Sequence, residues 1–510
     1  MWLRLIEQLD KIIDSITMYR LLLYYLGGLV LAAAGLSAVG VLHFSAISIL
    51  ISAIVLVFAC WLINKILASI FNAPVNPESS ILTGLILVLI LPPQPTGSGL
   101  LFMLAASGLA MASKYLLTIK RKHIFNPAAV AVVLTALGPR QSASWWVGTA
   151  SMLPFVIIGG LLLVRKIRRG QMVSVYLLAT TIVTAVFSIS GGQLIPNIKN
   201  MILTSSVFFL GFVMLTEPYT SPTTRTKQIW YAIIVGTLLA PQFHIGSYYP
   251  APEMALIFGN LFAYLTGDKT KLYLSLFRKY KIAGDTAEFS FVTNQKFDYK
   301  PGQYMEFTLP HEKPDSRGVR RYFTMSSSPT EDHLKLGVKF YEPGSSYKAA
   351  LLDIDQNSTF VGAQLAGDFV LPESDPNQKL LFIAGGIGIT PFRSMIKYLI
   401  DKHERRDIIL LYSVRSSDDL AYKELLDQAV KEIGLKVAYF ITSRQAKAVG
   451  VNVFRQQINR RVLTKQISDL DERLIYISGT HPMVESMQEL LHEIGIAHDR
   501  IKIDFFPGYA

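Results

Sequence analysis

Acidic residues are almost absent from the first half of this chain, and this absence constrains the fold more than any other feature of the sequence. Residues 21–267 contain no aspartate and only three glutamates, Glu78, Glu217 and Glu253. Runs of this composition are typical of helices that cross a lipid bilayer. The segment from Asp268 onward is charged throughout, which predicts a second half that folds in water. The apolar runs lie near residues 21–43, 46–64, 79–92, 98–117, 125–138, 146–164, 171–189, 200–216, 228–241 and 252–266.

These runs predict a polytopic α-helical membrane domain of about ten helices. Several runs are shorter than the ~20 residues that a full span needs. Two of the short runs end in prolines, Pro92 and Pro93 after the third, and Pro218 and Pro222 after the eighth. Proline-interrupted segments at corresponding positions of two halves indicate an inverted repeat whose broken helices line an internal site. Ordinary loop prolines are the alternative interpretation.

Basic residues fall mostly on alternate loops between the runs. Residues 120–122 and 165–169 form two such clusters, whereas only Arg140 and Lys199 fall on the opposite side. The positive-inside rule therefore predicts a multi-pass protein of the cytoplasmic membrane with both termini in the cytoplasm. The net charge of +12 reflects this topology and not nucleic-acid binding. The single cysteine, Cys60, excludes an intrachain disulfide and a cysteine-ligated iron–sulfur cluster.

Two proline-containing stretches carry a resemblance to a known membrane family. With Thr83, Gly84, Pro92 and Pro93, they resemble the RnfD/NqrB membrane subunits of the Rnf complex and the sodium-translocating NADH:quinone oxidoreductase. The resemblance implies a riboflavin or FMN group within the bundle, and Asn126 and Thr216 are candidate lining residues. Helix capping is an alternative role for both residues. The two stretches are Lys122-His123-Ile124-Phe125-Asn126-Pro127-Ala128-Ala129 and Phe212-Val213-Met214-Leu215-Thr216-Glu217-Pro218.

The family's covalent flavin attachment is not expected in this chain. Its flavinylated threonine follows an acid and a serine, and the nearest sequence here, Val147-Gly148-Thr149-Ala150, has neither. A membrane flavin is therefore expected to be non-covalent. Mid-span ionisable groups and paired histidines are scarce, which disfavours a dedicated ion pump and a pair of b-type haems.

The second half begins with short alternating runs and then changes pattern. Runs at 287–292, 303–309, 322–325 and 334–340 predict an antiparallel β-barrel. A buried strand at 380–384, a glycine turn, a helix at 391–401 and further strands at 408–413, 437–442 and 474–478 predict a doubly wound α/β domain. The expected domains are a membrane domain at 1–270, a flavin-binding barrel at 271–376 and a nucleotide-binding domain at 377–510.

Five motifs of this half, in this order, resemble the ferredoxin-NADP reductase superfamily. The resemblance covers residues 274–510 and implies an FAD-binding lobe beside an NAD(P)-binding lobe. The motifs are Pro301-Gly302-Gln303-Tyr304, Arg321-x-Phe323-Thr324-x-x-Ser327, Gly367-Asp368-Phe369, Gly385-Gly386-x-Gly388-Ile389-Thr390-Pro391 and Tyr476-Ile477-Ser478-Gly479.

The candidate flavin ligands gather around Arg321. A guanidinium is a fixed fork of donors that suits a pyrophosphate, and the resemblance gives Arg321 that task. Phe323 replaces the more common tyrosine and can stack on the isoalloxazine ring, which leaves hydrogen bonding near its N5 to Thr324. The other candidates are Tyr322 and Ser327 from the same stretch, and Gly344, Ser345 and Ser346, where the family opens a helix onto the flavin phosphate.

The glycine turn is the candidate nicotinamide-nucleotide site. Its backbone can approach a pyrophosphate at a helix N-terminus. At the hydride-transfer point the family often has a cysteine followed by glycine and proline, and Ser478 here can pack against the nicotinamide as the cysteine does. The resemblance implies that Asp504, Phe505 and Phe506 place an acid and aromatics where the family shields the flavin, with Phe506 as the candidate shield and an ordinary final strand as the alternative. Arg415 leaves NADH and NADPH undecided. The turn candidates are Gly385, Gly386, Gly388, Thr390, Pro391 and Gly479.

These resemblances predict a membrane-bound NAD(P)H dehydrogenase. Hydride from NADH or NADPH would reach FAD, and electrons would pass through a membrane flavin to a quinone or an extracytosolic flavoprotein. Membrane lipid and further membrane subunits are expected partners, and neither a metal nor nucleic acid is expected. The alternatives are a haem-dependent ferric-reductase-like enzyme and a transporter or anchor tethered to a soluble flavin reductase.

Overall fold

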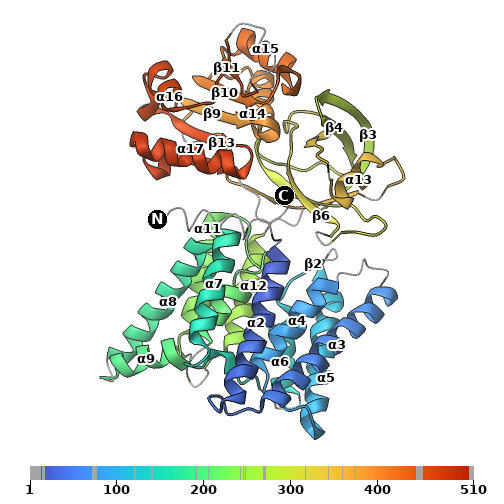
Figure 1. Ribbon diagram of the computed structural model, residues 1–510, viewed down its shortest axis with the longest axis vertical. Helices are drawn as coiled ribbons and strands as arrows, with labels where there is room; N and C mark the ends of the chain where they lie inside the picture. Colours follow the sequence, from blue (N-terminus) through green and yellow to red (C-terminus); the bar gives the residue numbers. More distant parts are fainter. Residues whose placement is uncertain are drawn as a thin grey trace. The chain divides into compact units, whose positions relative to one another are not determined.

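The chain forms two compact units that divide between Asp268 and Lys269 (Figure 1). The computed structural model describes residues 13, 16, 18–71, 77–119, 122–138, 142–189, 192–204, 206–241, 243–244, 246, 249–267, 271–315, 318–342, 344–358, 360–373, 375–443 and 452–504.

The first unit is helical, and every apolar run of the sequence contains helix. By length and apolar composition, α2, α3, α5 and α8 could each cross a membrane, and the bent pair α9 with residues 207–214 could supply a fifth span among the described residues. The number of spans therefore stays a prediction. The helices are α2 (Met18–Ala38), α3 (Ala46–Ile70), α4 (Pro77–Ile90), α5 (Gly97–Leu116), α6 (Pro127–Leu137), α7 (Leu153–Ile167), α8 (Gly170–Ile189), α9 (Leu194–Thr204), α10 (Val207–Phe209), the π-helical turn η2 (Leu210–Met214), α11 (Arg225–Leu239) and α12 (Pro252–Thr266).

Large apolar side chains cover the outside of these helices as well as the inside. Ile47, Ile54 and Leu101 are about 70% exposed, at 70%, 70% and 69%. A water-soluble bundle would direct such side chains inward, so this surface indicates contact with lipid. Prolines set several helix ends: α4 stops at Ile90 just before Pro92 and Pro93, and α6 begins at Pro127 behind its cap Asn126.

Helix contacts repeat between the two halves of this unit. In the first half α5 packs on α3 and α6, and in the second half α11 packs in the same way on α8 and α12. The halves meet through α2 with α7 and through α6 with α12. This matching pattern is what an internal repeat predicts.

The second unit starts with a curled antiparallel sheet in the order β6-β5-β8-β3-β4-β7. No ladder joins the edge strands β6 and β7 among the described residues, but Ser326, just after β6, donates its amide to Lys335 O in β7 at 2.8 Å. Aromatic residues such as Phe289, Phe291 and Phe307 fill the interior. The elements are β3 (Lys271–Ala283), β4 (Thr286–Thr293), β5 (Tyr304–Thr308), β6 (Arg320–Thr324), β7 (Leu334–Lys339), α13 (Ser346–Leu352) and β8 (Phe360–Ala366).

A parallel sheet in the order β12-β11-β10-β9-β13-β14 completes the unit. Its two faces are packed in separate clusters, as in a doubly wound fold, with Phe382 in one cluster and Ile383 in the other. The elements are β9 (Leu380–Gly385), η3 (Gly386–Ile389), α14 (Thr390–Asp401), β10 (Ile408–Val414), η4 (Ser417–Asp419), α15 (Lys423–Glu432), β11 (Lys436–Ile441), β12 (Val453–Phe454), α16 (Arg460–Gln466), η5 (Leu470–Glu472), β13 (Leu474–Ser478), α17 (His481–Ile494), η6 (His498–Arg500) and β14 (Ile501–Asp504).

Candidate functional sites

Two hydroxyls predicted from separate motifs meet at one carboxyl group. Thr324 ends β6 in the antiparallel lobe, and Ser478 ends β13 in the parallel lobe. Thr324 Oγ1 donates to Asp504 Oδ2 at 3.3 Å, and Ser478 Oγ donates to the same oxygen at 3.1 Å. The fold thus joins the flavin motif to the strand expected to carry the nicotinamide.

Asp504 was predicted only as the acid of the C-terminal segment at the flavin face, and its contacts with Thr324 and Ser478 were not foreseen. Parallel pairing of β13 and β14 places it beside Ser478, a register that the sequence does not reveal. Burial raises the pKa of Asp504 to about 7, against the lowering effect of the hydrogen bonds from Ser478 and Thr324. The carboxyl group can therefore gain and lose a proton near neutral pH. Phe506, the residue predicted to shield the flavin, lies outside the described residues.

The glycine turn fits a nucleotide pyrophosphate. Gly386 has φ +55°, and a Cβ built on it would meet no other atom within 4 Å, so this backbone faces open space. Gly388 differs, since a Cβ there would lie 2.4 Å from Ser478 O and 2.6 Å from Gly479 N. One glycine leaves room for a ligand, and the other lets the turn pack on the end of β13.

The flanking residues of this turn are mostly structural in the described chain. Thr390 Oγ1 donates to Ile387 O at 3.1 Å, and Pro391 is buried in the first turn of α14. Gly385 and Gly479 pack against each other, with a Cβ on Gly479 lying 3.3 Å from Gly385 Cα. Arg415 is exposed directly after β10, the strand next to the glycine turn.

Arg321 lies beside a carboxylate of the same chain, that of Asp315. Its guanidinium lies 5.0 Å from the Tyr347 ring centroid and 3.8 Å from Asp315 Oδ1. The other carboxylate oxygen of Asp315 accepts the amide of Ser346 at 3.0 Å. Ser345 caps α13 by accepting the amide of Lys348 at 3.2 Å. This donor set has the chemistry that a flavin pyrophosphate requires, and Gly344 immediately precedes it.

The remaining residues of the flavin stretch have different surroundings. Phe323 is half-buried, with its ring centroid 6.1 Å from both Phe307 and Tyr347. Tyr322 packs edge-on against Tyr304 at 5.7 Å. Ser327 is fully buried; its Oγ accepts the Lys335 amide at 3.0 Å and lies 2.9 Å from Tyr299 OH. The structure therefore gives Ser327 a role in joining strands and directs it away from open space.

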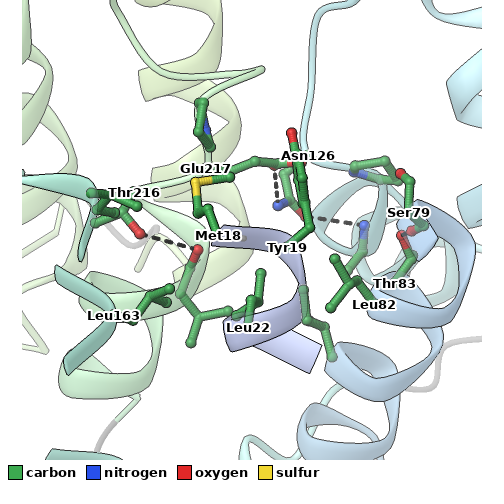
Figure 2. A pocket seen from close by; sticks show the side chains of 16 residues that line it. Met18, Tyr19, Leu22, Ser79, Leu82, Thr83, Asn126, Leu163, Thr216 and Glu217 are labelled. Atoms are coloured by element: carbon green, nitrogen blue, oxygen red, sulfur yellow. Dashed lines mark hydrogen bonds between the residues drawn. The ribbon is translucent and has the colours of Figure 1, made fainter. Parts of the chain in front are cut away.

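A second site lies inside the helical unit, where its two halves meet. Asn126 and Thr216, the two residues predicted for a membrane flavin, line the same pocket (Figure 2). Leu22, Leu82 and Val213 supply part of its apolar wall. The lining residues are Met18, Tyr19, Leu22, Ser79, Leu82, Thr83, Ile86, Asn126, Pro127, Ala128, Leu163, Ile167, Val213, Thr216, Glu217 and Pro218.

Polar groups of the pocket form a network that the sequence did not reveal. Asn126 Oδ1 caps α6 by accepting the amides of Ala128 and Ala129, both at 3.1 Å. Its Nδ2 donates to Glu217 Oε2 at 2.7 Å, as Figure 2 shows. Thr220 Oγ1 donates to the same Glu217 oxygen at 3.0 Å. Asn126 therefore has both of its predicted positions, as a cap and as a pocket residue.

The hydroxyl groups of Thr216 and Thr83, which also line the pocket, donate hydrogen bonds to backbone carbonyls. Thr216 Oγ1 donates to Phe212 O at 2.7 Å, and Thr83 Oγ1 donates to Ser79 O at 2.9 Å. Lys114 Nζ donates to Ser79 O at 2.9 Å. Thr216 follows the π-helical turn η2, a distortion frequent at functional sites. The pocket is thus rich in hydrogen-bond acceptors.

Comparison with known families agrees with this division. Residues 137–271 match the NQR2, RnfD, RnfE family. Residues 273–362 match the oxidoreductase FAD-binding domain, and residues 382–489 match the oxidoreductase NAD-binding domain. The chain therefore carries an RnfD/NqrB-type segment in its N-terminal half and a ferredoxin reductase-like pair of domains in its C-terminal half.

Two curated relatives each match less than half of this chain. The Bacillus subtilis flavohemoprotein is 27% identical over 211 residues, which are 41% of this chain and 52% of that protein. The glycine betaine monooxygenase reductase subunit of Pseudomonas aeruginosa is 29% identical over 231 residues, 44% of this chain and 60% of that protein. The chain thus spans between half and two thirds of each relative's length.

Among solved structures, the flavohem-like FAD/NAD binding domain of nitric oxide dioxygenase from Vibrio cholerae is 19% identical with a TM-score of 0.40. The aligned region covers 46% of this chain and 98% of the chain in that structure.

Proposed function

We propose that this chain is a membrane-bound NAD(P)H dehydrogenase that passes electrons from its C-terminal unit into its helical unit. The observation that carries the proposal is the meeting of Thr324 and Ser478 at Asp504. These residues come from the two lobes, so a flavin and a nicotinamide held by their motifs would be brought together. FAD, when bound, supplies the chemistry, since it accepts hydride as a pair of electrons and releases electrons singly.

The chain's own residues bind and orient the two cofactors in this proposal. Arg321 holds the flavin pyrophosphate in place of the Asp315 carboxylate, and Phe323 contacts the ring. The backbone around Gly386 receives the nicotinamide pyrophosphate. Ser478 packs against the nicotinamide, and Asp504 holds a proton within reach of Thr324 and Ser478. Closure of the two lobes around the reacting atoms excludes water.

The pocket of Figure 2 is the proposed seat of a non-covalent FMN or riboflavin. The hydroxyl groups of Thr83 and Thr216 donate to backbone carbonyl oxygens, so each hydroxyl oxygen is left to accept a hydrogen bond from a ligand. An oxidised quinone head has only carbonyl acceptors and would leave these lone pairs unmatched. A flavin offers an imide N–H and ribityl hydroxyls as donors. The pocket chemistry therefore favours a flavin, and a quinone is better suited to a later step as the terminal acceptor.

The proposed topology follows the distribution of basic residues. The helical unit is an inverted repeat of about ten helices in the cytoplasmic membrane, with both termini cytoplasmic. Residues 18, 79, 126, 167 and 217 lie near helix ends that this topology places on the cytoplasmic side. Electrons would enter there and leave to a quinone or to an extracytosolic flavoprotein, with further membrane subunits as partners.

Flavin content tests the proposal. Full-length protein is purified from membranes, precipitated with acid, and its released FAD, FMN and riboflavin are separated and counted per chain. One FAD plus one second flavin per chain is expected, with both reduced by NADH or NADPH. FAD alone would instead support a reductase tethered to a membrane anchor. Sharp haem bands in a reduced-minus-oxidised spectrum would replace the proposal with a ferric-reductase-like enzyme.

A further inference from the structure

β6, which carries the flavin motif and is here called the flavin strand, is joined by buried polar contacts to α14, which follows the glycine turn and is here called the nicotinamide helix. The contacts lie two and three residues beyond Thr324. Ser326 and Ser327 follow Thr324 by two and three positions and are fully buried. Arg393 and Ser394 lie in the first turns of α14, which follows the glycine turn directly. Arg393 Nη1 donates to Ser326 O at 3.0 Å, and Ser394 Oγ donates to Ser327 O at 2.6 Å.

Arg393 also forms an ion pair across the same boundary. Its Nη2 donates to Glu331 Oε1 at 3.0 Å, and its Nη1 is paired with the second carboxylate oxygen. Glu331 sits in the turn between β6 and β7 and accepts the amide of Ser328 at 2.7 Å. Arg393 is buried and Glu331 is largely shielded, with side-chain exposures of 8% and 12%. One guanidinium thus holds a backbone carbonyl and a carboxylate that both belong to the opposite lobe.

We infer that Arg393 is a positioning residue, which fixes the flavin strand against the nicotinamide helix and so sets the distance over which hydride moves. The inference rests on the proposed function. Arg393 contacts Ser326, Glu331 and the Tyr422 ring, whose centroid lies 5.6 Å from its guanidinium carbon. None of these three is a candidate cofactor-binding residue, and Arg393 acts through Ser326 and the turn that holds Glu331.

The chemistry of the pair supports positioning over simple stabilisation. A buried ion pair is often no more stabilising than apolar residues of similar volume, because both charges lose their hydration. A guanidinium, however, orients two acceptors in one plane, which a lysine cannot do. Although burial opposes it, the hydrogen bond and charge of Arg393 lower the pKa of Glu331 to about 2. The pair therefore stays charged across the whole physiological range.

The same carboxylate provides a matched control. Lys335 Nζ binds Glu331 Oε1 at 2.8 Å, but Lys335 lies in β7 of the same lobe. Loss of the Lys335 side-chain charge removes one ion pair of Glu331 and leaves the contacts between the two lobes unchanged. The variants to compare in the full-length protein are therefore Arg393→Lys, Ser394→Ala and Lys335→Ala.

The primary measurement is stopped-flow reduction of the bound flavin over a range of nucleotide concentrations. It separates the limiting rate constant from the nucleotide dissociation constant. Arg393→Lys is expected to lower the limiting rate constant on the order of ten- to a hundred-fold, with FAD content unchanged, because small misplacements of reactants have effects of this size. Ser394→Ala should cause a smaller loss of the same kind, and Lys335→Ala should stay within about two-fold of wild type.

A second measurement does not need nucleotide turnover. Hydrogen exchange of the amides of residues 326–331 is followed in the full-length protein, and Arg393→Lys is expected to increase it where Lys335→Ala does not. The inference is overturned if Arg393→Lys keeps both the wild-type limiting rate constant and wild-type exchange, or if Lys335→Ala matches its losses. Failure of the wild-type protein to reduce its flavin with either nucleotide would reject the proposed function separately, and the exchange data would still decide the positioning role.

Discussion

At the scale of single residues, the C-terminal unit places one titratable group where two predicted hydroxyls converge. Asp504 is buried, and its pKa of about 7 lies above the ordinary 3.8 of the carboxyl group. A group that binds its proton more tightly in the folded state favours folding while it is protonated. Its unfavourable contribution appears as pH rises from about 4 to about 7.

Replacing Asp504 by asparagine tests this assignment. The wild-type C-terminal unit is expected to lose thermal stability as pH rises from 5 to 8, since the buried carboxyl group must ionise. Asp504→Asn should flatten that dependence, because an amide has no proton to lose in this range. Scanning calorimetry of the full-length protein in detergent at several pH values gives the comparison. An equal slope in both proteins would contradict the raised pKa of Asp504.

Two glycines of one turn give a contrasting pair of substitutions. Gly386→Ala should cost about 1–2 kcal/mol, because a side chain at φ +55° is strained but meets no other atom within 4 Å. Gly388→Ala should cost about 3 kcal/mol, because its Cβ would lie 2.4 Å from backbone atom Ser478 O. Thermal unfolding gives the order of stability, and nucleotide titration should show weakened binding for Gly386→Ala. Equal destabilisation by both substitutions would argue against this account of the turn.

At the scale of elements, the helical unit uses helix ends to build its pocket. The cap of α6 at Asn126 and the segment after η2 at Glu217 are joined by one hydrogen bond of 2.7 Å. Proline explains both ends, since Pro127 opens α6 and Pro218 prevents helix from continuing beyond Glu217. The helix breaks seen in the sequence therefore correspond to polar groups inside the bundle.

Substitution of Asn126 separates its two roles. Asn126→Ala removes the cap of α6 and should destabilise the helical unit by about 1 kcal/mol. Asn126→Ser keeps a capping oxygen but is too short to reach Glu217, so it should recover stability without recovering the proposed second flavin. Thermal unfolding and flavin content per chain are measured together. Full recovery of flavin by the serine variant would show that capping is the only role of Asn126.

At the scale of the whole molecule, one chain meets two solvents. Residues 21–267 nearly lack acidic groups, and their helices expose large apolar side chains, whereas the C-terminal unit buries its apolar residues in separate cores. The basic loops predict on which side of the membrane each connection lies.

Reporter fusions test this topology. Alkaline phosphatase inserted between Ser142 and Ala143 should be active, since that loop is predicted to lie outside the cytoplasm. The same reporter inserted after Gly170, or fused to the C-terminus, should be inactive, because Arg165, Lys166, Arg168 and Arg169 retain their loop inside. An active C-terminal fusion would place the nucleotide lobe away from its cytosolic substrate and reverse the proposed direction of electron flow.

Sequence patterns located most strands of the C-terminal unit, and the misses have physical causes. The strands at 287–292 and 380–384 appear as β4 and β9, nearly to the residue. β3 was not predicted, because bulges between Leu276 and Arg278 and between Lys281 and Ala283 break its alternation. Similarly, the two-residue strand β12 is too short to give a periodic signal.

The candidate sites were also predicted only in part. Motif positions such as Arg321, Ser478 and the glycines could be named because their motifs resemble those of the ferredoxin-NADP reductase superfamily. The contacts of these and other predicted residues could not be named, because they depend on strand register, loop conformation or helix packing. They are Ser478 with Asp504, Arg321 with Asp315, Ser326 with Arg393, and Asn126 with Glu217.

The amino-acid sequence alone determined the two solvents, the helix breaks and the cofactor motifs, since composition, proline and glycine act locally. Only the tertiary structure decided that Thr324 and Ser478 share one carboxyl group, that Ser327 is a strand contact, and that Asn126 and Thr216 line one pocket. The physical reason is that a side chain's partner depends on which elements the folded chain packs together, and packing is a property of the whole sequence at once.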